Sequence, residues 1–231
     1  MFCNCFSLKN MEELRYLNTE NVTNFSFTFG EDSYVKDHLD KQFLSFTNIN
    51  FLSTLNVSNG VNFKSIFRGC KKLSNIKALE NWDVSNGIYF NDVFCSCRLL
   101  SDISPLKNWN VSKGKNFANM FIWCYSLEDI SPLKNWNVSN SEKFYEMFCD
   151  CHKLTNIKVL ENWNVSNCLD FSSMFECCYE LENIESLKNW KVLNNADFSR
   201  MFYKCNLSGL NSLKNWYISQ KSKEYMMRKK D

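Results

Sequence analysis

The sequence predicts an α/β solenoid in which each repeat of about 27 residues contributes one short parallel strand and one short helix. Three observations lead to this prediction: a fixed spacing between tryptophans, an apolar pattern typical of a helix, and a second apolar segment that is too short for another helix. Hydrophobic residues make up 45% of the 231 positions, which is enough for a continuous core.

The repeat is visible in several columns of identical residues. Tryptophan recurs at intervals of 27, 27, 27, 27 and 26 residues, at Trp82, Trp109, Trp136, Trp163, Trp190 and Trp216. Cysteine keeps a 27-residue step at Cys70, Cys97, Cys124, Cys151, Cys178 and Cys205. We therefore expect an irregular N-terminal half repeat and degenerate coil in residues 1–54, six repeats in residues 55–219, and a basic C-terminal tail or cap in residues 220–231.

The helix is predicted from the segment that ends at each cysteine. Phe144, Met147, Phe148 and Cys151 stand at positions i, i+3, i+4 and i+7, which lie on one face of a helix of about three turns. Upstream, Ser139 and Glu142 have the spacing of a capping box. Each repeat is therefore expected to begin its helix just after a Val-Ser-Asn turn.

The strand is predicted from the segment that follows the cysteine. In "LEDISPLKN", residues 127–135, Leu127, Ile130 and Leu133 are expected to point inward over a span too short for a second helix. Strands of successive repeats would lie parallel, about 4.8 Å apart. An asparagine precedes each column tryptophan, and we expect its amide to stack over its copy and satisfy free backbone groups.

The unit resembles a known repeat family. The segment 127–135 has the spacing of the leucine-rich-repeat strand motif, and "LEDISPLKNWNVSNSEKFYEMFCDC" resembles the BspA-like repeats of bacterial surface proteins. The resemblance covers residues 55 to about 219. It implies a leucine-rich-repeat-type solenoid and, from the family, surface adhesion or binding of host proteins, without a cofactor.

Composition argues against several other function classes. A formal net charge of +2 gives no overall attraction to nucleic acid or to an anionic membrane surface. No apolar run approaches the ~18 residues that a membrane-spanning helix needs. His38 and His152 are far apart in the array and no catalytic motif accompanies them, so we do not expect an enzyme. The resemblance favours the cell surface, but the sequence has no evident export signal or anchor, so a cytoplasmic location stays open.

The repeated cysteines and tryptophans are interpreted as parts of the core. One cysteine per coil at the end of an apolar face is typical of a small buried residue. Disulfides or a metal site are the less favoured alternatives, because the chain has two histidines and no C-x-x-C pair. Trp123 lies outside the tryptophan column and is the better candidate for an exposed contact.

Binding residues are expected where the repeats differ from one another. Positions between the inward leucines and isoleucines would present a variable strand face to a protein partner, at Asp102, Glu128, Asp129, Lys158, Glu182 and Glu185. The acidic residues among them are a hint of a basic partner. Two alternatives stay open: an intracellular or orphan repeat fragment with no specific partner, and a metal-binding or thiol-binding protein.

Overall fold

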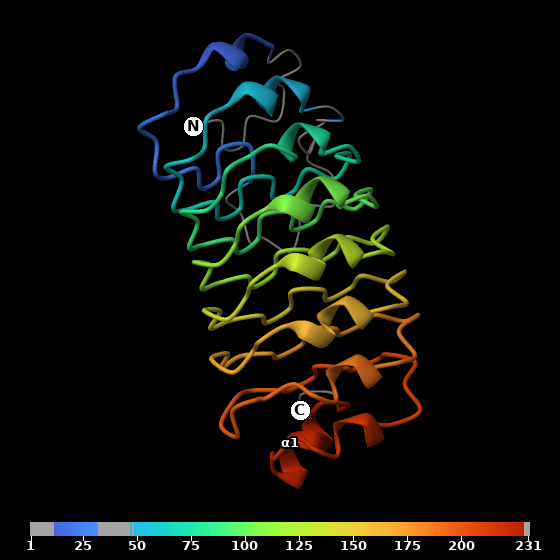
Figure 1. Cartoon of the computed structure of the whole chain (residues 1–231). Helices are drawn as coiled ribbons and strands as arrows, with labels where there is room; N and C mark the ends of the chain where they lie inside the picture. Colours follow the sequence, from blue (N-terminus) through green and yellow to red (C-terminus); the bar gives the residue numbers. More distant parts are fainter. Residues whose placement is uncertain (1–11, 32–46, 48, 229–231) are drawn as a thin grey trace.

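The chain forms a single elongated stack of coils. The computed structural model describes residues 12–31, 47 and 49–228. The coils follow one another along the stack from the N-terminal to the C-terminal end, and each places a short helical turn close to that of its neighbours (Figure 1). The predicted repeat solenoid is therefore confirmed, whereas the half repeat expected in residues 1–11 lies outside the described residues.

The helices are short, and all but the last are 3-10 helices. Their bounds are η1 Glu12–Tyr16, η2 Asn50–Thr54, η3 Lys77–Leu79, η4 Ser104–Asn108, η5 Ser131–Asn135, η6 Lys158–Asn162, η7 Glu185–Leu187, η8 Asn211–Leu213 and α1 Gln220–Tyr225. Within the described residues, β-structure is limited to single parallel bridges that connect equivalent positions of successive coils, such as Asn116 with Lys143. The described residues therefore lack the predicted strand of each repeat.

The helix predicted from Phe144 to Cys151 is wrong, because this segment is a run of tight turns. Alternate backbone amides donate to the next coil, as from Phe144 to the carbonyl oxygen of Asp170 at 2.9 Å. The amides between them close turns within the coil, as from Met147 to the carbonyl of Phe144 at 3.1 Å. We call this arrangement the backbone ladder. The same four-residue spacing places Phe144 and Phe148 on the inner side, which is why the pattern looked helical.

The backbone ladder requires left-handed residues at every fourth position. Glu146 and Asp150 have φ angles of 54° and 59°, and the equivalent residues of the other coils also have positive φ angles. For residues other than glycine this conformation costs roughly 1–2 kcal/mol, and asparagine and aspartate tolerate it best. Asn119 and Asp92, which occupy the position of Glu146 in their own coils, therefore adopt this conformation at low cost. Where the residue is bulkier, the hydrogen bonds between coils offset the strain.

The segment predicted as a strand forms a 3-10 helix instead. In the repeat quoted above, η5 occupies Ser131–Asn135, and Pro132 lies in its first turn, where a missing amide costs nothing. Leu133 is fully buried beneath the helix. The only β-bridge of this segment joins Asp129 to Asn156 of the next coil.

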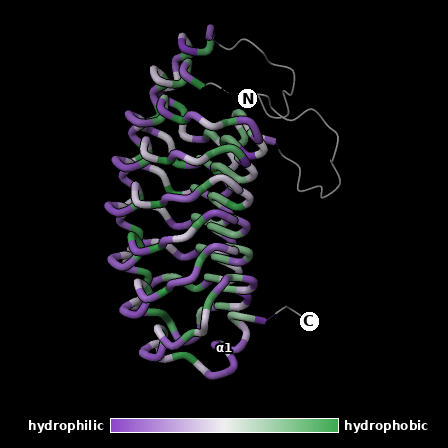
Figure 2. The backbone as a smooth tube through the Cα atoms, turned by 90° about the vertical axis from the view of Figure 1, so that its right-hand side faces the viewer, coloured by the Kyte–Doolittle hydropathy of each residue, from purple (hydrophilic) through white to green (hydrophobic). Residues whose placement is uncertain are grey.

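Aromatic side chains fill the interior in continuous stacks. The two phenylalanine columns have neighbouring rings 5.3–6.0 Å apart, as for Phe121 and Phe148 at 5.7 Å. The apolar segments of successive coils lie over one another, and many of the outer turns consist of hydrophilic residues (Figure 2). Because each ring contacts its copies above and below, the core is shared between coils.

The tryptophan column belongs to this core, as predicted. All six indoles are buried, and each nitrogen donates to a backbone carbonyl of the preceding coil, as from Trp136 Nε1 to the oxygen of Leu106 at 3.0 Å. The equivalent bond recurs for Trp82, Trp109, Trp163, Trp190 and Trp216. Tryptophan therefore contributes both apolar area and a donor that phenylalanine lacks.

The cysteine column is also internal, which confirms its interpretation as small buried residues. Cys124 is fully buried, and its Sγ donates to the carbonyl oxygen of Phe94 at 3.3 Å. Burial raises the pKa of the Cys124 thiol well above its ordinary value. The described cysteines are all free thiols, and they include Cys95, Cys149, Cys168 and Cys177 outside the column.

Two predictions about polar side chains are wrong. The asparagines that precede the tryptophans, such as Asn135, are exposed and form no side-chain bond with the described residues. A different column links the coils, as where Asn140 Nδ2 donates to the carbonyl of Ser112 at 2.7 Å. The capping box is absent too, because the Ser139 amide donates to Asn137 Oδ1 and Glu142 pairs with Lys115.

Helix α1 closes the C-terminal end of the described stack. The amides of Arg200 and Phe202 donate to the carbonyls of Tyr225 and Met226 at 2.8 and 2.9 Å. Met226 is fully buried in the core. The last residue of α1 and the residue after it therefore accept the bonds that a further coil would otherwise accept.

We expect Trp136→Phe to lower the free energy of unfolding by roughly 1–2 kcal/mol, because the buried carbonyl of Leu106 keeps its bond from the Trp109 amide but loses its second donor, the indole nitrogen. Urea denaturation followed by circular dichroism measures this change. Trp123→Phe is the matched control, since the Trp123 side chain is 37% exposed, and its effect should stay within about 0.5 kcal/mol. Equal losses for both variants would contradict the role of the indole bond.

We also expect the column thiols to be unreactive in the folded protein. Cys124, Cys151 and Cys178 are fully buried, and burial raises the pKa of each. Little thiolate therefore forms at pH 8 to attack a disulfide reagent. Labelling followed by peptide mass spectrometry should show these three modified only after denaturation in urea. Native labelling at the rate seen in urea would show that the stack opens.

Candidate interaction surface

The residues predicted for binding are all exposed, and they lie at or just before the starts of the 3-10 helices. They are Asp102 before η4, Glu128 and Asp129 before η5, Lys158 at the start of η6, and Glu182 and Glu185 before and at the start of η7. Since successive 3-10 helices are in contact, these side chains fall on one side of the stack, which we call the 3-10 face.

Some of these side chains also shape the backbone locally. Asp129 Oδ1 accepts a bond from the Ser131 amide at 2.8 Å, and Asp102 does the same for Ser104 at 2.8 Å. The next coil has the same turn, with Asn156 Oδ1 bound to the Lys158 amide at 2.7 Å. Asparagine and aspartate are favoured at such turns because their side chains replace a backbone acceptor. Asp102 and Asp129 therefore have a structural role beside any role in binding.

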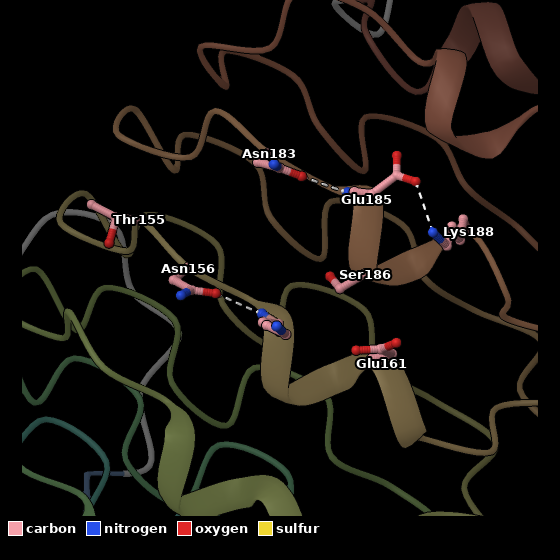
Figure 3. Close-up of a pocket in the computed structure, with 8 residues that line it drawn as sticks. Thr155, Asn156, Glu161, Asn183, Glu185, Ser186 and Lys188 are labelled. Carbon is pink, nitrogen blue, oxygen red and sulfur yellow. Dashed lines mark hydrogen bonds and ion pairs between the residues drawn. The ribbon is translucent and has the colours of Figure 1, made fainter.

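A groove of about 500 Å³ lies between η6 and η7. Its walls include Lys158 and Glu161 from one coil and Glu185 and Lys188 from the next. Figure 3 shows Glu161, Glu185 and Lys188 in this groove. Glu185 Oε1 lies 3.0 Å from Lys188 Nζ, and this hydrogen-bonded ammonium lowers the pKa of Glu185. Both side chains are about half exposed, so the pair contributes little to stability and is free to exchange for a ligand.

A neighbouring groove of about 380 Å³ lies between η5 and η6 and is lined in part by Asp129, Lys134, Lys158 and Glu161. The structure thus brings Lys158 together with Glu185 in one groove and with Asp129 in the other.

The other predicted residues lie outside the linings of these two grooves. Glu128 is exposed on the surface, and Glu182 accepts a bond from Asn206 Nδ2 at 3.0 Å. Asp102 lies farther along the stack, before η4.

Sequence reasoning missed the basic side of these grooves. Lys134 and Lys188 occur three residues after the start of their helices, so the helical turn places them beside the predicted acidic residues. The hint of a basic partner rested on the acids alone. With Lys134, Lys158 and Lys188 present, the grooves carry both signs of charge.

A second group of charges lies on the backbone ladder, between the inward phenylalanines. Arg68 Nη1 is 2.7 Å from Asp92 Oδ1, and both side chains are almost fully buried. Arg200 binds Glu176 through Nε at 2.9 Å. Removing one partner of a buried pair leaves the other charge without compensation, so the Arg68–Asp92 pair constrains the structure strongly, whereas the Arg200–Glu176 pair is partly exposed. The sequence signal was a charged residue flanked by column phenylalanines, as Asp92 is.

Glu146 lies on the same part of the coil. Burial, and then the negative charges of Glu176, Asp92 and Asp150, raise the pKa of Glu146, while Arg200 lowers it. This carboxyl is therefore the group whose protonation the fold favours.

An aromatic stack occupies a further column. The rings of Tyr125 and His152 are 4.7 Å apart, and those of His152 and Tyr179 are 4.8 Å apart. His152 Nε2 also lies 3.2 Å from Asp150 Oδ1. Trp123 is exposed, as the sequence predicted, while its role in a contact stays a prediction. These rings add a partly exposed aromatic surface that the sequence analysis did not anticipate.

The described residues include no group of three or more histidine, cysteine or acidic side chains placed to hold a metal ion. In the same part of the chain, no helix has the length and apolar character that crossing a membrane requires.

One family model matches this chain. It carries the description "Mycoplasma protein of unknown function, DUF285", and it matches residues 37–157 and 128–230, so the two matches together extend over most of the sequence. No curated protein matches the chain at a significant level.

Solved structures with some likeness include three internalins of Listeria monocytogenes. Internalin C2 is 11% identical, with 74% of this chain and 73% of that chain covered and a TM-score of 0.25. InlF is 16% identical, with coverage of 77% and 72% and a TM-score of 0.15. The functional domain of InlJ, which includes a cysteine ladder, is 9% identical, with coverage of 78% and 51% and a TM-score of 0.16. Scores of this size carry no argument about function.

We expect Glu146→Gln to raise the thermal midpoint at pH 7. The folded pKa of Glu146 lies above its unfolded value, so its contribution to stability is complete at low pH and is lost as the pH rises through the folded pKa. The advantage of the variant should therefore shrink as the pH falls toward about 4. Calorimetry across this range measures the difference. Glu142→Gln, at an exposed carboxylate paired with Lys115, should give no gain at pH 7.

Proposed function

This chain belongs to the family described as "Mycoplasma protein of unknown function, DUF285", and from that premise we propose that it is a non-enzymatic repeat scaffold that binds a protein partner. The observation that carries the proposal is the variability of the exposed 3-10 face. At the same position of successive coils this face presents Lys77, Ser104, Ser131, Lys158 and Glu185. Solenoids commonly bind partners through an extended surface of this kind.

The grooves between the 3-10 helices support this proposal physically. Lys158, Glu161, Glu185 and Lys188 line one of them and supply two positive and two negative charges. Their side chains are not locked in buried pairs, so a partner with complementary charges can replace the internal contacts at small cost. Charged grooves of this kind favour selectivity and fast association more than high affinity.

The residues proposed to contact the partner are those that the sequence indicated: Asp102, Glu128, Asp129, Lys158, Glu182 and Glu185. We extend the set by Lys134, Glu161 and Lys188, because they line the same grooves. The domain division at residues 54 and 219 is kept as part of this proposal, with the binding surface in the repeats.

The finer proposal concerns the place of action. The resemblance of the repeats to BspA-like units supports adhesion or host-protein binding at the cell surface. This part of the proposal rests on the resemblance alone, and it is separate from the binding surface.

We expect charge reversal at Glu128, Asp129, Glu182 and Glu185 to abolish capture of the partner protein while the protein stays folded, because all four side chains are exposed. The thermal midpoint should fall by only about 2–4 °C, because the Ser131 amide loses its bond to Asp129 Oδ1. Affinity capture by wild type and variant from the same extract, with quantitative mass spectrometry, measures the loss.

The matched control reverses Glu13, Glu20, Glu142 and Glu224, which are also exposed and give the same change in net charge. If capture is unchanged in the first variant, or is lost equally in the control, the placement of the surface on the 3-10 face is wrong.

A further inference from the structure

Asparagine is repeated without variation at one exposed position of six successive coils. These residues directly precede the buried tryptophans, and they are Asn81, Asn108, Asn135, Asn162, Asn189 and Asn215. None of the six side-chain amides forms a hydrogen bond with the described residues. We call this column the asparagine ladder.

Folding does not explain why this column is constant. Other constant columns are buried or bound to a neighbouring coil, as Trp136 and Cys124 are. The asparagines do not adopt the left-handed conformation that would favour asparagine, since none has a positive φ. The exposed column on one side varies between glutamate and lysine. The column on the other side is aspartate or asparagine in four coils, where its side chain accepts a backbone amide of its own turn, and it becomes Lys191 and Tyr217 in the last two. An asparagine that is the same in six coils at an exposed position, without a bond that folding would require, indicates a contact that all six coils share.

The spacing of the ladder matches that of an extended peptide. Neighbouring indoles are nearly parallel, with ring centroids 6.4 Å apart for Trp82 and Trp109 and 6.2 Å apart for Trp190 and Trp216. These two distances give the separation of the indole rings that follow the asparagines at the two ends of the tryptophan column. An extended chain rises about 6.7 Å per two residues, and its backbone amide and carbonyl face the same edge at every second residue. The mismatch of about 0.3–0.5 Å per coil is small for flexible side chains.

The chemistry of the amide fits the same ligand. An asparagine side chain offers an acceptor and two donors, so it can accept from the N–H and donate to the C=O of one peptide residue at the same time. We propose that the asparagine ladder binds an extended, acidic segment of the partner protein along the axis of the stack, one amide for every two residues. This inference rests on the proposed function and names the chemistry of the partner.

Charge beside the ladder selects acidic side chains in that segment. The flanking column consists of Glu80, Lys107, Lys134, Glu161, Lys188 and Lys214, and its four lysines and two glutamates give a net charge of +2. Lys107 pairs with Glu80 and Lys188 pairs with Glu185, but these pairs are largely exposed, so an acidic ligand can replace them at small cost. At the C-terminal end, a groove of about 310 Å³ is lined by Lys188, Asn189, Lys191, Asn215 and Tyr217, among others. Alternate side chains of an extended segment point to the same side, so acidic residues at every second position would face the lysines.

A library of random dodecapeptides displayed on phage is the probe, because six coils at two residues each span about a dozen residues. Wild-type protein should select peptides with acidic residues at alternate positions. The double variant Asn135→Ala with Asn162→Ala should bind a selected peptide at least about ten-fold more weakly, with an unchanged thermal midpoint. The double control Asn194→Ala with Asn211→Ala, at exposed asparagines outside the ladder, should bind as wild type does.

N-methylation of the selected peptide tests the backbone contact directly. Methyl groups on one alternate set of amides should abolish binding, and methyl groups on the other set should not, because only one edge of the peptide faces the asparagines. The proposal is wrong if the wild type selects no peptide, if the asparagine variant binds the peptide as well as the wild type does, or if the two methylated sets have the same effect. If partner capture nevertheless depends on Glu128, Asp129, Glu182 and Glu185, the 3-10 face still binds a partner and only the ladder is wrong.

Discussion

The structure depends on how the backbone amides of the turn segments are satisfied. A segment such as residues 144–151 cannot bond all its amides internally, because its left-handed residues interrupt any helix. Alternate amides donate to the next coil, and the carbonyls between them accept from the preceding one. A buried amide without a partner costs as much as a lost hydrogen bond, so no coil is stable without neighbours. Each coil must therefore follow the path of the one before it, which places equivalent side chains over one another.

Two side-chain donors complete this arrangement on the other sides of the core. Trp136 reaches the carbonyl of Leu106, and Cys124 reaches that of Phe94, each across thirty residues. The indole and the thiol are mainly apolar groups that carry one donor, so they give these carbonyls, which already accept the Trp109 and Cys97 amides, a second bond without bringing an unpaired polar atom inside. This explains why the chain uses tryptophan and cysteine where phenylalanine and alanine would fill space alone. These two interior columns therefore bond to the neighbouring coil, whereas the phenylalanine and leucine columns only pack against it.

The repeat and its inward columns could be predicted, because any regular stack buries the same position of each coil. The local backbone could not. The spacing of Phe144, Met147, Phe148 and Cys151 suits a helix and a run of tight turns equally, and it says nothing about where the amides donate. The exposed positions at the starts of the 3-10 helices were also predictable, since they lie between inward residues. Their basic neighbours were missed because the assumed strand would have pointed Lys134 and Lys188 elsewhere.

In a stack of this kind, identity and variation between coils carry different information. A buried column is constant because its members contact their own copies, so constancy there reports packing. An exposed column has no such requirement, and constancy there indicates a ligand that is itself regular. A peptide backbone is regular, whereas side chains are not. In the proposed mode, the asparagine ladder would supply affinity for the main chain and the variable grooves would supply selectivity for side chains. That separation lets the variable positions change without loss of the shared contact.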